Sequence, residues 1–436
     1  PRLFSAASRE ADDEAAAARV GEVLISHLGM SVDEVAAAVT ARPALAKAEP
    51  TALVNRIDYL RDSLNLHTAK LRALVAAAPP LLGYELEHTV KPKVEWLASY
   101  LGLSLPDVGV AVTRFPLVLG YSLEERLRPR VAELEARGLS RDVVARMVKT
   151  YPQLFSMPAA TVAAKLAFLA SDLGLTVAEQ TRVLSSNPNI MGRSVEDHLR
   201  PWVSFCSGLP SEGPPGPVAG LGMSQADMRR MAVHFPQALG YSVERNVIPT
   251  MQYFADEWGV PHPDLKRLLT LYPRTLGLSV ETNLKPKAAY FTDTLGLSPD
   301  QLRDLVLDFP PLLGYSLESN IKAKVDVLTA FVTRVLPALP DDHPLSVASS
   351  PPAIDLAATI TAGPRLFSYS LPRVHARLAR FADPSLARAG VFGKPDAIVC
   401  DGALKLGPVL TPTDAQLDKR IARAQRKASK ASSTPQ

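Results

Sequence analysis

Residues 116–134 read PLVLGYSLEERLRPRVAEL, and this stretch contains the local signals that define the fold. Pro116 ends the helical pattern before it, because proline donates no N–H and disfavours the helical conformation of the preceding residue. Gly120 offers a permissive turn position and Ser122 is a typical N-cap. Apolar side chains then recur along one helical face at Leu123, Leu127, Val131 and Leu134. We therefore expect one helix to end before residue 116 and another to begin near residue 122.

This stretch is one copy of a repeat. Close copies occupy residues 79–97, 236–254, 273–291 and 310–328, and weaker copies follow Pro152, Pro188 and Pro364. Six of the eight intervals between successive anchor prolines are 36 or 37 residues long, in the series Pro43, Pro79, Pro116, Pro152, Pro188, Pro236, Pro273, Pro310 and Pro364. The two longer intervals contain proline-rich insertions at 208–222 and 337–352, which we predict to be surface loops.

An amphipathic helix is predicted before each anchor proline. Before Pro310, for example, Ser298 and Gln301 have the spacing of a capping box. The apolar residues that follow lie at i, i+3, i+4 and i+7, namely Leu302, Leu305, Val306 and Phe309. The helix after the anchor has its own proline in five copies, at Pro92, Pro129, Pro201, Pro249 and Pro286, which should bend it or be confined to its first turn.

Two helices and a tight turn per unit bury their apolar faces only when neighbouring units stack. The sequence therefore predicts an all-α helical-repeat solenoid of about eight units, spanning residues 31–382. We expect an N-terminal segment at 1–30, a C-terminal extension at 383–412 and a basic tail at 413–436. Strand-like alternation is limited to a short run at 397–400.

Composition limits the functional classes. The chain has 436 residues, and 47% of them are apolar, which excludes a mainly disordered chain. Its two cysteines are too few for a disulfide framework. The sequence contains no run of about 18 consecutive apolar residues, so it predicts no membrane-spanning helix. Lys and Arg exceed Asp and Glu by 48 to 44, and the tail from Thr413 accounts for the whole excess. Because the body is neutral, it can bind a polyanion only by sorting its charges onto one face.

Basic residues flank the second-helix proline in most units and are the candidate nucleic-acid contacts. Stacking would place them in a row that could follow a phosphate backbone. The alternative is that they are solvated helix positions, some paired with a glutamate four residues earlier, as Glu124 precedes Arg128. The row comprises Lys91, Lys93, Arg128, Arg130, Arg200, Lys285 and Lys287, with Lys322 and Lys324 around Ala323.

The basic tail is a second candidate contact. It can be a basic helix or an arm that becomes ordered on RNA or DNA, and a purely solubilising tail is the alternative. Thr413 is a candidate cap for such a helix. The tail cations assigned to nucleic-acid binding are Lys419, Arg420, Arg423, Arg426 and Lys427.

Four tyrosines recur at the repeat period, namely Tyr84, Tyr121, Tyr241 and Tyr315. They could stack on bases, but Leu278 fills the same position in another unit, which favours packing between units. Catalytic motifs are missing: the sequence contains no Walker loop, no G-x-S-x-G and no histidine pair at ligand spacing. We therefore expect no enzymatic activity, no metal or cofactor and no small-molecule substrate.

The repeat unit resembles that of the mTERF family, the mitochondrial transcription termination factor proteins of organelles. The shared pattern, P-x-L-L-G-Y-S-L-E-x-x-L-x-P-K-V-x-x-L-x-x-x-L-G-L-S, is nearly complete at 79–102 and 273–298, and the resemblance covers roughly 320 residues. The resemblance implies a left-handed superhelix of triangular repeats, each with two α-helices and a short 3₁₀ turn. Its concave side would bind double-stranded DNA or RNA without catalysis. Two units depart from the pattern, with Ser156-Met157 and Ser368-Tyr369 in place of Gly-Tyr.

Three functions are consistent with this sequence. The first is a structural RNA-binding protein of an organellar ribonucleoprotein such as the mitochondrial ribosome, with neighbouring proteins as further partners. The second is a double-stranded DNA-binding regulator of transcription termination, and the third is a protein–protein scaffold. A neutral body favours the first, because strong sequence-independent DNA affinity needs phosphate neutralisation. Pro1 to Arg9 is acid-free and fits the remainder of a cleaved transit peptide, so we expect a mitochondrial location, with the chloroplast second.

Overall fold

The fold is described from a computed structural model, which covers residues 2–208, 220–339, 354–388, 391–392, 399–400 and 403–432. Side chains of 2–14, 387–388, 399–400, 425 and 427–432 are not described. Residues 209–219 and 340–352 of the insertions predicted at 208–222 and 337–352 lie outside the described residues. The chain divides into two compact units. Unit 1 comprises Pro1–Ser204 and Ser224–Gly240, and unit 2 comprises Phe205–Met223 and Tyr241–Gln436.

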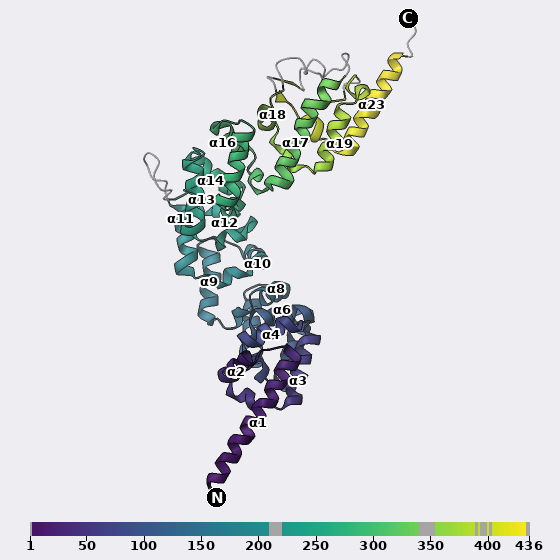
Figure 1. Ribbon diagram of the computed structural model, residues 1–436. Helices are drawn as coiled ribbons and strands as arrows, with labels where there is room; N and C mark the ends of the chain where they lie inside the picture. The colour runs from purple at the N-terminus through teal and green to yellow at the C-terminus, as the bar shows by residue number, and fades with distance from the viewer. Residues whose placement is uncertain are drawn as a thin grey trace. The chain divides into compact units, whose positions relative to one another are not determined.

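The described residues are almost entirely helical, as predicted (Figure 1). They contain nine copies of one pattern, which is a first helix, a 3₁₀ turn and a second helix. The first helices are α2 (Val32–Ala41), α4 (Thr68–Ala77), α6 (Leu105–Arg114), α8 (Arg141–Thr150), α10 (Val177–Ser186), α12 (Gln225–His234), α14 (His262–Leu271), α16 (Pro299–Asp308) and α18 (Leu356–Ala362).

In each of the nine copies the 3₁₀ turn begins at an anchor proline, which confirms the predicted stop signal. The turns are η1 (Pro43–Lys47), η3 (Pro79–Gly83), η5 (Pro116–Gly120), η7 (Pro152–Phe155), η8 (Pro188–Gly192), η10 (Pro236–Gly240), η12 (Pro273–Gly277), η15 (Pro310–Gly314) and η20 (Pro364–Ser368). Within unit 1 each turn packs on the turn of the next repeat, from η1 through η10, and within unit 2 the same holds from η12 to η20.

The second helices follow the turns. They are α3 (Pro50–Asp58), α5 (Lys91–Leu101), α7 (Arg128–Ala136), α9 (Ala159–Ser171), α11 (Arg200–Ser207), α13 (Ile248–Asp256), α15 (Lys285–Ala289), α17 (Ala323–Ala330) and α19 (Leu371–Phe381). Six of them are preceded by a π turn, namely η4 (Leu86–Val90), η6 (Leu123–Leu127), η9 (Val195–Leu199), η11 (Val243–Val247), η13 (Val280–Leu284) and η16 (Leu317–Lys322). Further π turns continue second helices at η2 (Tyr59–Ser63), η14 (Tyr290–Thr294) and η17 (Phe331–Val335), and η18 (Leu336–Ala338) is a 3₁₀ turn.

The second-helix proline lies in the first turn of the α segment, as Pro129 does in α7. The wider turn before it has an i to i−5 hydrogen bond, for instance from Leu127 N–H to Ser122 C=O at 3.1 Å. The repeat with Ala323 instead of proline also has the π turn, so proline is compatible with this turn but not required for it.

Local capping confirms the predicted helix starts. Ser298 and Gln301 form the capping box of α16, and Ser122 accepts a hydrogen bond from the N–H of Glu125. One residue separates the end of each first helix from its anchor proline. In α16, for example, the Phe309 N–H donates back to the Leu305 carbonyl, and the backbone of Phe309 leaves the helical conformation (φ −133°). Apolar faces then fill the core, where Leu302, Leu305 and Val306 are at most 3% exposed.

The ends of the chain depart from the repeat. The N-terminal α1 (Arg2–Leu28) packs on α2, α3 and η1. At the other end lie α20 (Pro384–Arg388), an antiparallel pair of two-residue strands, β1 (Val399–Cys400) and β2 (Ala403–Leu404), the short α22 (Gly407–Leu410), and α23 (Asp414–Ser432). The tail predicted at 413–436 is therefore helical through Ser432.

Candidate nucleic-acid interface

The cations that flank the second-helix proline fall into two groups with different surroundings. In the four complete Lys/Arg pairs, the member after the proline position is buried, with exposed fractions of 7, 5, 3 and 2% for Lys93, Arg130, Lys287 and Lys324. The prediction that these four side chains line an exposed surface is therefore corrected. Helix geometry explains the difference, because residues two apart point about 200° away from each other around the helix.

Each buried cation holds the next repeat in place. Lys93 Nζ donates to the carbonyl oxygen of Leu119 at 2.6 Å, and Lys324 Nζ donates to that of Phe367 at 2.7 Å. Lys287 reaches Leu313 and Arg130 reaches Met157 in the same way. We call these contacts turn staples, since a second helix supplies the donor and the next 3₁₀ turn, or the residue pair after it, supplies the acceptor. Burial lowers the pKa of Lys93 and Lys324 and lowers that of Lys287 to about 8.

Residues that sequence reasoning did not single out play the same role elsewhere. Arg126 donates to the carbonyl oxygen of Phe155 at 2.7 Å, and His198 contacts that of Leu239 at 3.0 Å. The buried Lys165 donates to the carbonyl oxygen of Arg193. A staple therefore recurs at most repeat junctions within the described residues, although the donor type changes. The staple gives a hydrogen-bond donor to a turn carbonyl that becomes buried when repeats stack.

The cations before the proline position are more exposed but ion-paired. Each lies four residues after a glutamate on its own helix, with N–O distances of 2.5 to 3.0 Å in the pairs Glu87–Lys91, Glu124–Arg128, Glu196–Arg200, Glu281–Lys285 and Glu318–Lys322. Three of them also lie over an aromatic ring of the preceding second helix, as Arg128 lies 5.6 Å from the centre of the Trp96 ring. These pairs add no net charge, so this row is a poor source of attraction for phosphates.

A different row of cations lies on the first helices. The residue six positions before the anchor proline is an arginine in four consecutive repeats, Arg146 in α8, Arg182 in α10, Arg230 in α12 and Arg267 in α14, and all four are exposed. In the other described repeats this position holds Ala37, Ala73, Val110, Asp304 or Ala358. Comparison of the polar positions in register with the anchor prolines would have found this row from sequence.

Three of these arginines belong to unit 1, where α8 packs on α10 and α10 packs on α12. We call Arg146, Arg182 and Arg230 the arginine row. No described acidic group forms an ion pair with any of them, in contrast to neighbouring Arg229, whose guanidinium contacts the Glu179 carboxylate at 3.0 Å. Since adjacent packed helices lie about 8 to 10 Å apart, the row's arginines stand on helices at roughly that interval.

A groove of about 280 Å³ lies between α10 and α12 and includes one member of the row. Its lining contains Arg230, the Arg229–Glu179 pair and His234. Arg230 and His234 are four residues apart and both exposed, so they share one face of α12. A guanidinium and an imidazole next to an open groove can both donate hydrogen bonds to a phosphate.

The recurrent tyrosines pack between repeats where the structure defines their contacts. A Cβ added at Gly120 would lie 2.3 Å from the Tyr84 hydroxyl, and one added at Gly277 would lie 2.1 Å from that of Tyr241. The terminal glycines of η5 and η12 thus make room for a tyrosine of the preceding repeat. These contacts support packing rather than base stacking for Tyr84 and Tyr241.

The tail cations Lys419, Arg420, Arg423 and Arg426 are exposed on α23, whereas the Lys427 side chain lies outside the described residues. Thr413 caps α23, because its hydroxyl accepts from the Gln416 N–H at 3.2 Å.

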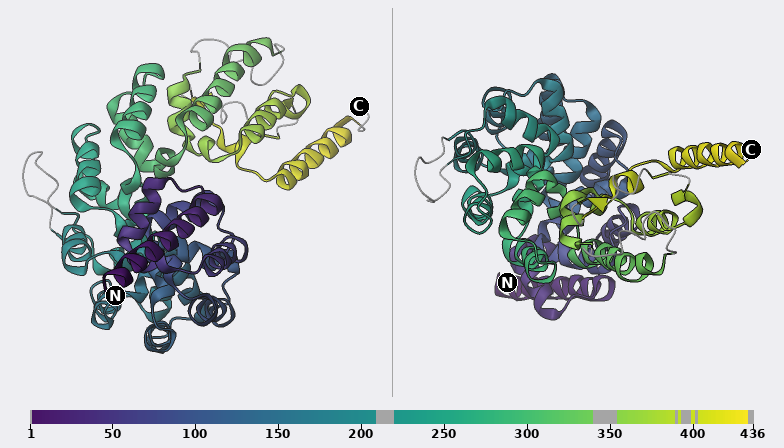
Figure 2. Two further views of the ribbon diagram at one scale, coloured as in Figure 1. Left: turned by 60° about the horizontal axis from the view of Figure 1, so that its bottom comes forward. Right: turned by 90° about the horizontal axis from the view of Figure 1, so that it is seen from above.

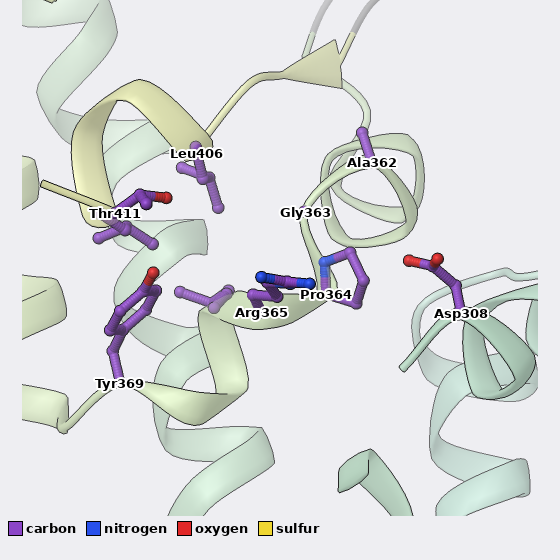
Figure 3. A pocket seen from close by; sticks show the side chains of 11 residues that line it. Asp308, Ala362, Gly363, Pro364, Arg365, Tyr369, Leu406 and Thr411 are labelled. Carbon is purple, nitrogen blue, oxygen red and sulfur yellow. The ribbon is translucent and has the colours of Figure 1, made fainter. Parts of the chain in front are cut away.

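A cavity in unit 2 is lined by η20 and α22 (Figure 3). Asp308, Arg365, Tyr369 and Thr411 contribute polar groups to it. Its volume of about 180 Å³ is below the range of roughly 300 to 1,000 Å³ that is usual for small-molecule sites. Among the described residues, no group of three or more His, Cys, Asp or Glu side chains could hold a metal ion, and no helix is long and apolar enough to cross a membrane.

Comparison with known proteins identifies the repeat. The family model described as mTERF matches residues 11–143, 134–210 and 217–339, which is more than half of the chain. No curated protein matches the chain significantly.

Proposed function

Because the chain belongs to the mTERF family, whose members are generally non-enzymatic nucleic-acid-binding proteins of organelles, we propose that it binds structured RNA of an organellar ribonucleoprotein. Family membership alone suggests a nucleic-acid-binding regulator of organellar gene expression. The finer assignment to RNA, and to a complex such as the mitochondrial ribosome with neighbouring proteins as partners, is our proposal. The mitochondrion is the proposed location.

The arginine row is the observation that carries this proposal. Guanidinium groups make bidentate hydrogen bonds to phosphates and remain charged at any physiological pH. A nucleic-acid strand advances about 3.4 Å per phosphate, so arginines carried by helices about 8 to 10 Å apart can reach every second or third phosphate. The row is confined to adjacent repeats, and none of its members holds a turn carbonyl among the described contacts. It therefore has no evident packing role.

The distribution of charge favours RNA that is already folded. Lys and Arg equal Asp and Glu in number before Thr413, and many of the second-helix cations are used in staples or ion pairs. A body with so few available cations supports only a modest counterion-release contribution to affinity. Such a protein suits an RNA whose shape is preformed and whose charge is shared with neighbouring proteins.

Salt-dependent binding tests this function. We expect wild-type protein to bind a structured RNA better than a DNA duplex of equal length, with an affinity that falls as salt rises. The triple variant Arg146→Gln, Arg182→Gln, Arg230→Gln should reduce the log–log salt slope by about 2 to 3, since each lost phosphate contact contributes about 0.7 to 0.9. A matched control removes three ion-paired lysines by Lys91→Gln, Lys285→Gln and Lys322→Gln, and its slope should stay near the wild-type value.

Each contrary outcome identifies an alternative. Tighter binding to duplex DNA would favour a regulator of transcription termination. Affinity that does not depend on salt would favour a protein–protein scaffold. Equal losses in the arginine-row variant and the control would show that net charge matters and the arginine row does not.

A further inference from the structure

The C-terminal helix α23 carries its charges on separate sides. At 100° per residue, Lys419, Arg420, Arg423 and Arg426 fall within an arc of about 120° around the helix. Asp414 and Asp418 lie on the opposite half, together with Leu417 and Ile421. We call the four cations the α23 stripe. The stripe extends about 10 Å along the helix axis.

The opposite half of α23 is anchored to α19. Asp414 contacts Arg377 at 2.6 Å, and Asp418 contacts Arg380 at 3.2 Å, so both acids of the helix are engaged on the inner side. Leu417 is fully buried, and the guanidinium of Arg377 also donates to the Pro412 carbonyl at 2.9 Å. Beyond these contacts α23 extends away from α19 toward the C-terminus (Figure 2). The start of the helix is thus fixed, and the stripe is presented in a defined orientation on unit 2.

The stripe differs from every other set of helical cations discussed above. Lys419 and Arg423 are like charges at i, i+4, and Arg420 and Arg423 are like charges at i, i+3, with no acid at i−4 or i+4 of any of these three. Like charges at these spacings repel one another and destabilise a helix. A bound polyanion would relieve this repulsion, whereas the second-helix cations are already relieved by their own glutamates.

From these observations we infer that the α23 stripe is a separate binding surface for the phosphate backbone of a nucleic acid. Three of its four members are arginines, which suit phosphate geometry better than lysines do. A membrane surface is a poorer fit, because among the side chains that the structure describes the opposite face offers only Ile421 and Ala424 beyond the buried Leu417, and interfacial helices need a broad apolar face. The inference rests on the proposed function only for the class of partner and does not require the arginine row.

The test uses the full chain and a 20-base-pair RNA duplex with a single-stranded overhang. The variant Lys419→Gln, Arg420→Gln, Arg423→Gln should weaken binding at 0.1 M salt by between tenfold and a few hundredfold, and should lower the salt slope by about 2 to 3. The control Lys91→Gln, Lys285→Gln, Lys322→Gln removes the same charge from paired sites and should change affinity less than threefold. Circular dichroism should show unchanged helix content for both variants without RNA.

The outcomes separate this inference from the proposed function. Wild-type protein that binds neither RNA nor DNA would overturn both. Wild-type binding that the α23 variant retains in full would overturn the inference alone, and loss only in the α23 variant would leave it standing without the arginine row. Equal competition by polyglutamate, or α23-dependent binding to vesicles with 30% phosphatidylserine in preference to RNA, would assign the stripe to an acidic protein or a lipid surface instead.

Discussion

Replacement of Lys324 by methionine tests whether the buried cations hold repeats together or contact nucleic acid. Lys324 is 2% exposed in α17, and its ammonium donates to the Phe367 carbonyl in η20 at 2.7 Å and to the Asn320 side chain at 2.9 Å. Methionine keeps most of the aliphatic stem and removes only the charged donor. The substitution therefore isolates the staple from the packing around it.

The expected cost follows from those two contacts. A hydrogen bond from a charged donor contributes about 1.5 to 3 kcal/mol, and the Phe367 carbonyl would be left buried without this partner. The lowered pKa of Lys324 shows that burial of the ammonium has its own cost, which methionine does not bear. We expect a net loss of about 2 kcal/mol at the junction of α17 and η20. Lys324→Ala should lose about 2 kcal/mol more, because it also leaves a cavity.

Hydrogen exchange is a suitable assay, because a repeat protein opens locally and one global transition need not describe it. A loss of 2 kcal/mol should speed exchange of the amides in η20 and α19 by roughly thirtyfold. The control Lys322→Met removes a half-buried lysine paired with Glu318 and should cost less than about 0.5 kcal/mol. Equal exchange rates in the two variants would refute the staple, and so would a lower RNA salt slope for Lys324→Met with unchanged exchange.

Three other predictions concern single positions. Gly277→Ala should destabilise its junction by about 1 to 3 kcal/mol in urea denaturation, because its Cβ would overlap the Tyr241 hydroxyl, and Tyr241→Phe in the same chain should recover part of the loss. Ser298→Ala should cost about 1 kcal/mol by the same measurement, since the capping box of α16 is lost. Burial lowers the pKa of Lys287 to about 8 in the folded chain, below the usual lysine value of 10.5, so the unfolded chain binds more protons between these values. The free energy of unfolding should therefore rise from pH 8 to pH 10.5 relative to Lys287→Met, and a constant difference would contradict the assigned burial.

The repeat architecture could be predicted because its signals are local. An anchor proline and a capping serine act on backbone groups within four residues, so the start of α16 at Ser298 follows from the sequence alone. The π turn before the second helix was not predicted. Proline at position 129 is compatible with either a bend or a first-turn placement, and only the backbone shows that an i−5 hydrogen bond precedes it.

The candidate site was predicted less well, for a geometric reason. The repeat spacing alone places Lys91 and Lys93 in one row, although residues two apart on a helix face nearly opposite directions. The acceptor of Lys93 is the Leu119 carbonyl, 26 residues farther along the chain, and no local pattern indicates that a lysine will be buried against it. The glutamate four residues before Lys91 was a usable signal for the ion pair that the structure contains.

How widely a cation recurs along the repeats separates packing roles from binding roles in this chain. Stacking of one repeat on the next buries a turn carbonyl, so a donor is useful at each repeat junction, and buried donors such as Lys93 and Lys324 recur across distant repeats. A ligand of limited length contacts only some repeats, so the residues that bind it should be restricted to neighbouring repeats. Arg146, Arg182 and Arg230 meet that condition, because the equivalent position is alanine or valine before them and aspartate in α16. If that reasoning is correct, an arginine placed at Val110 should extend the surface by one repeat and raise the salt slope by about 0.9, whereas an arginine at Ala37, three repeats from α8, should not.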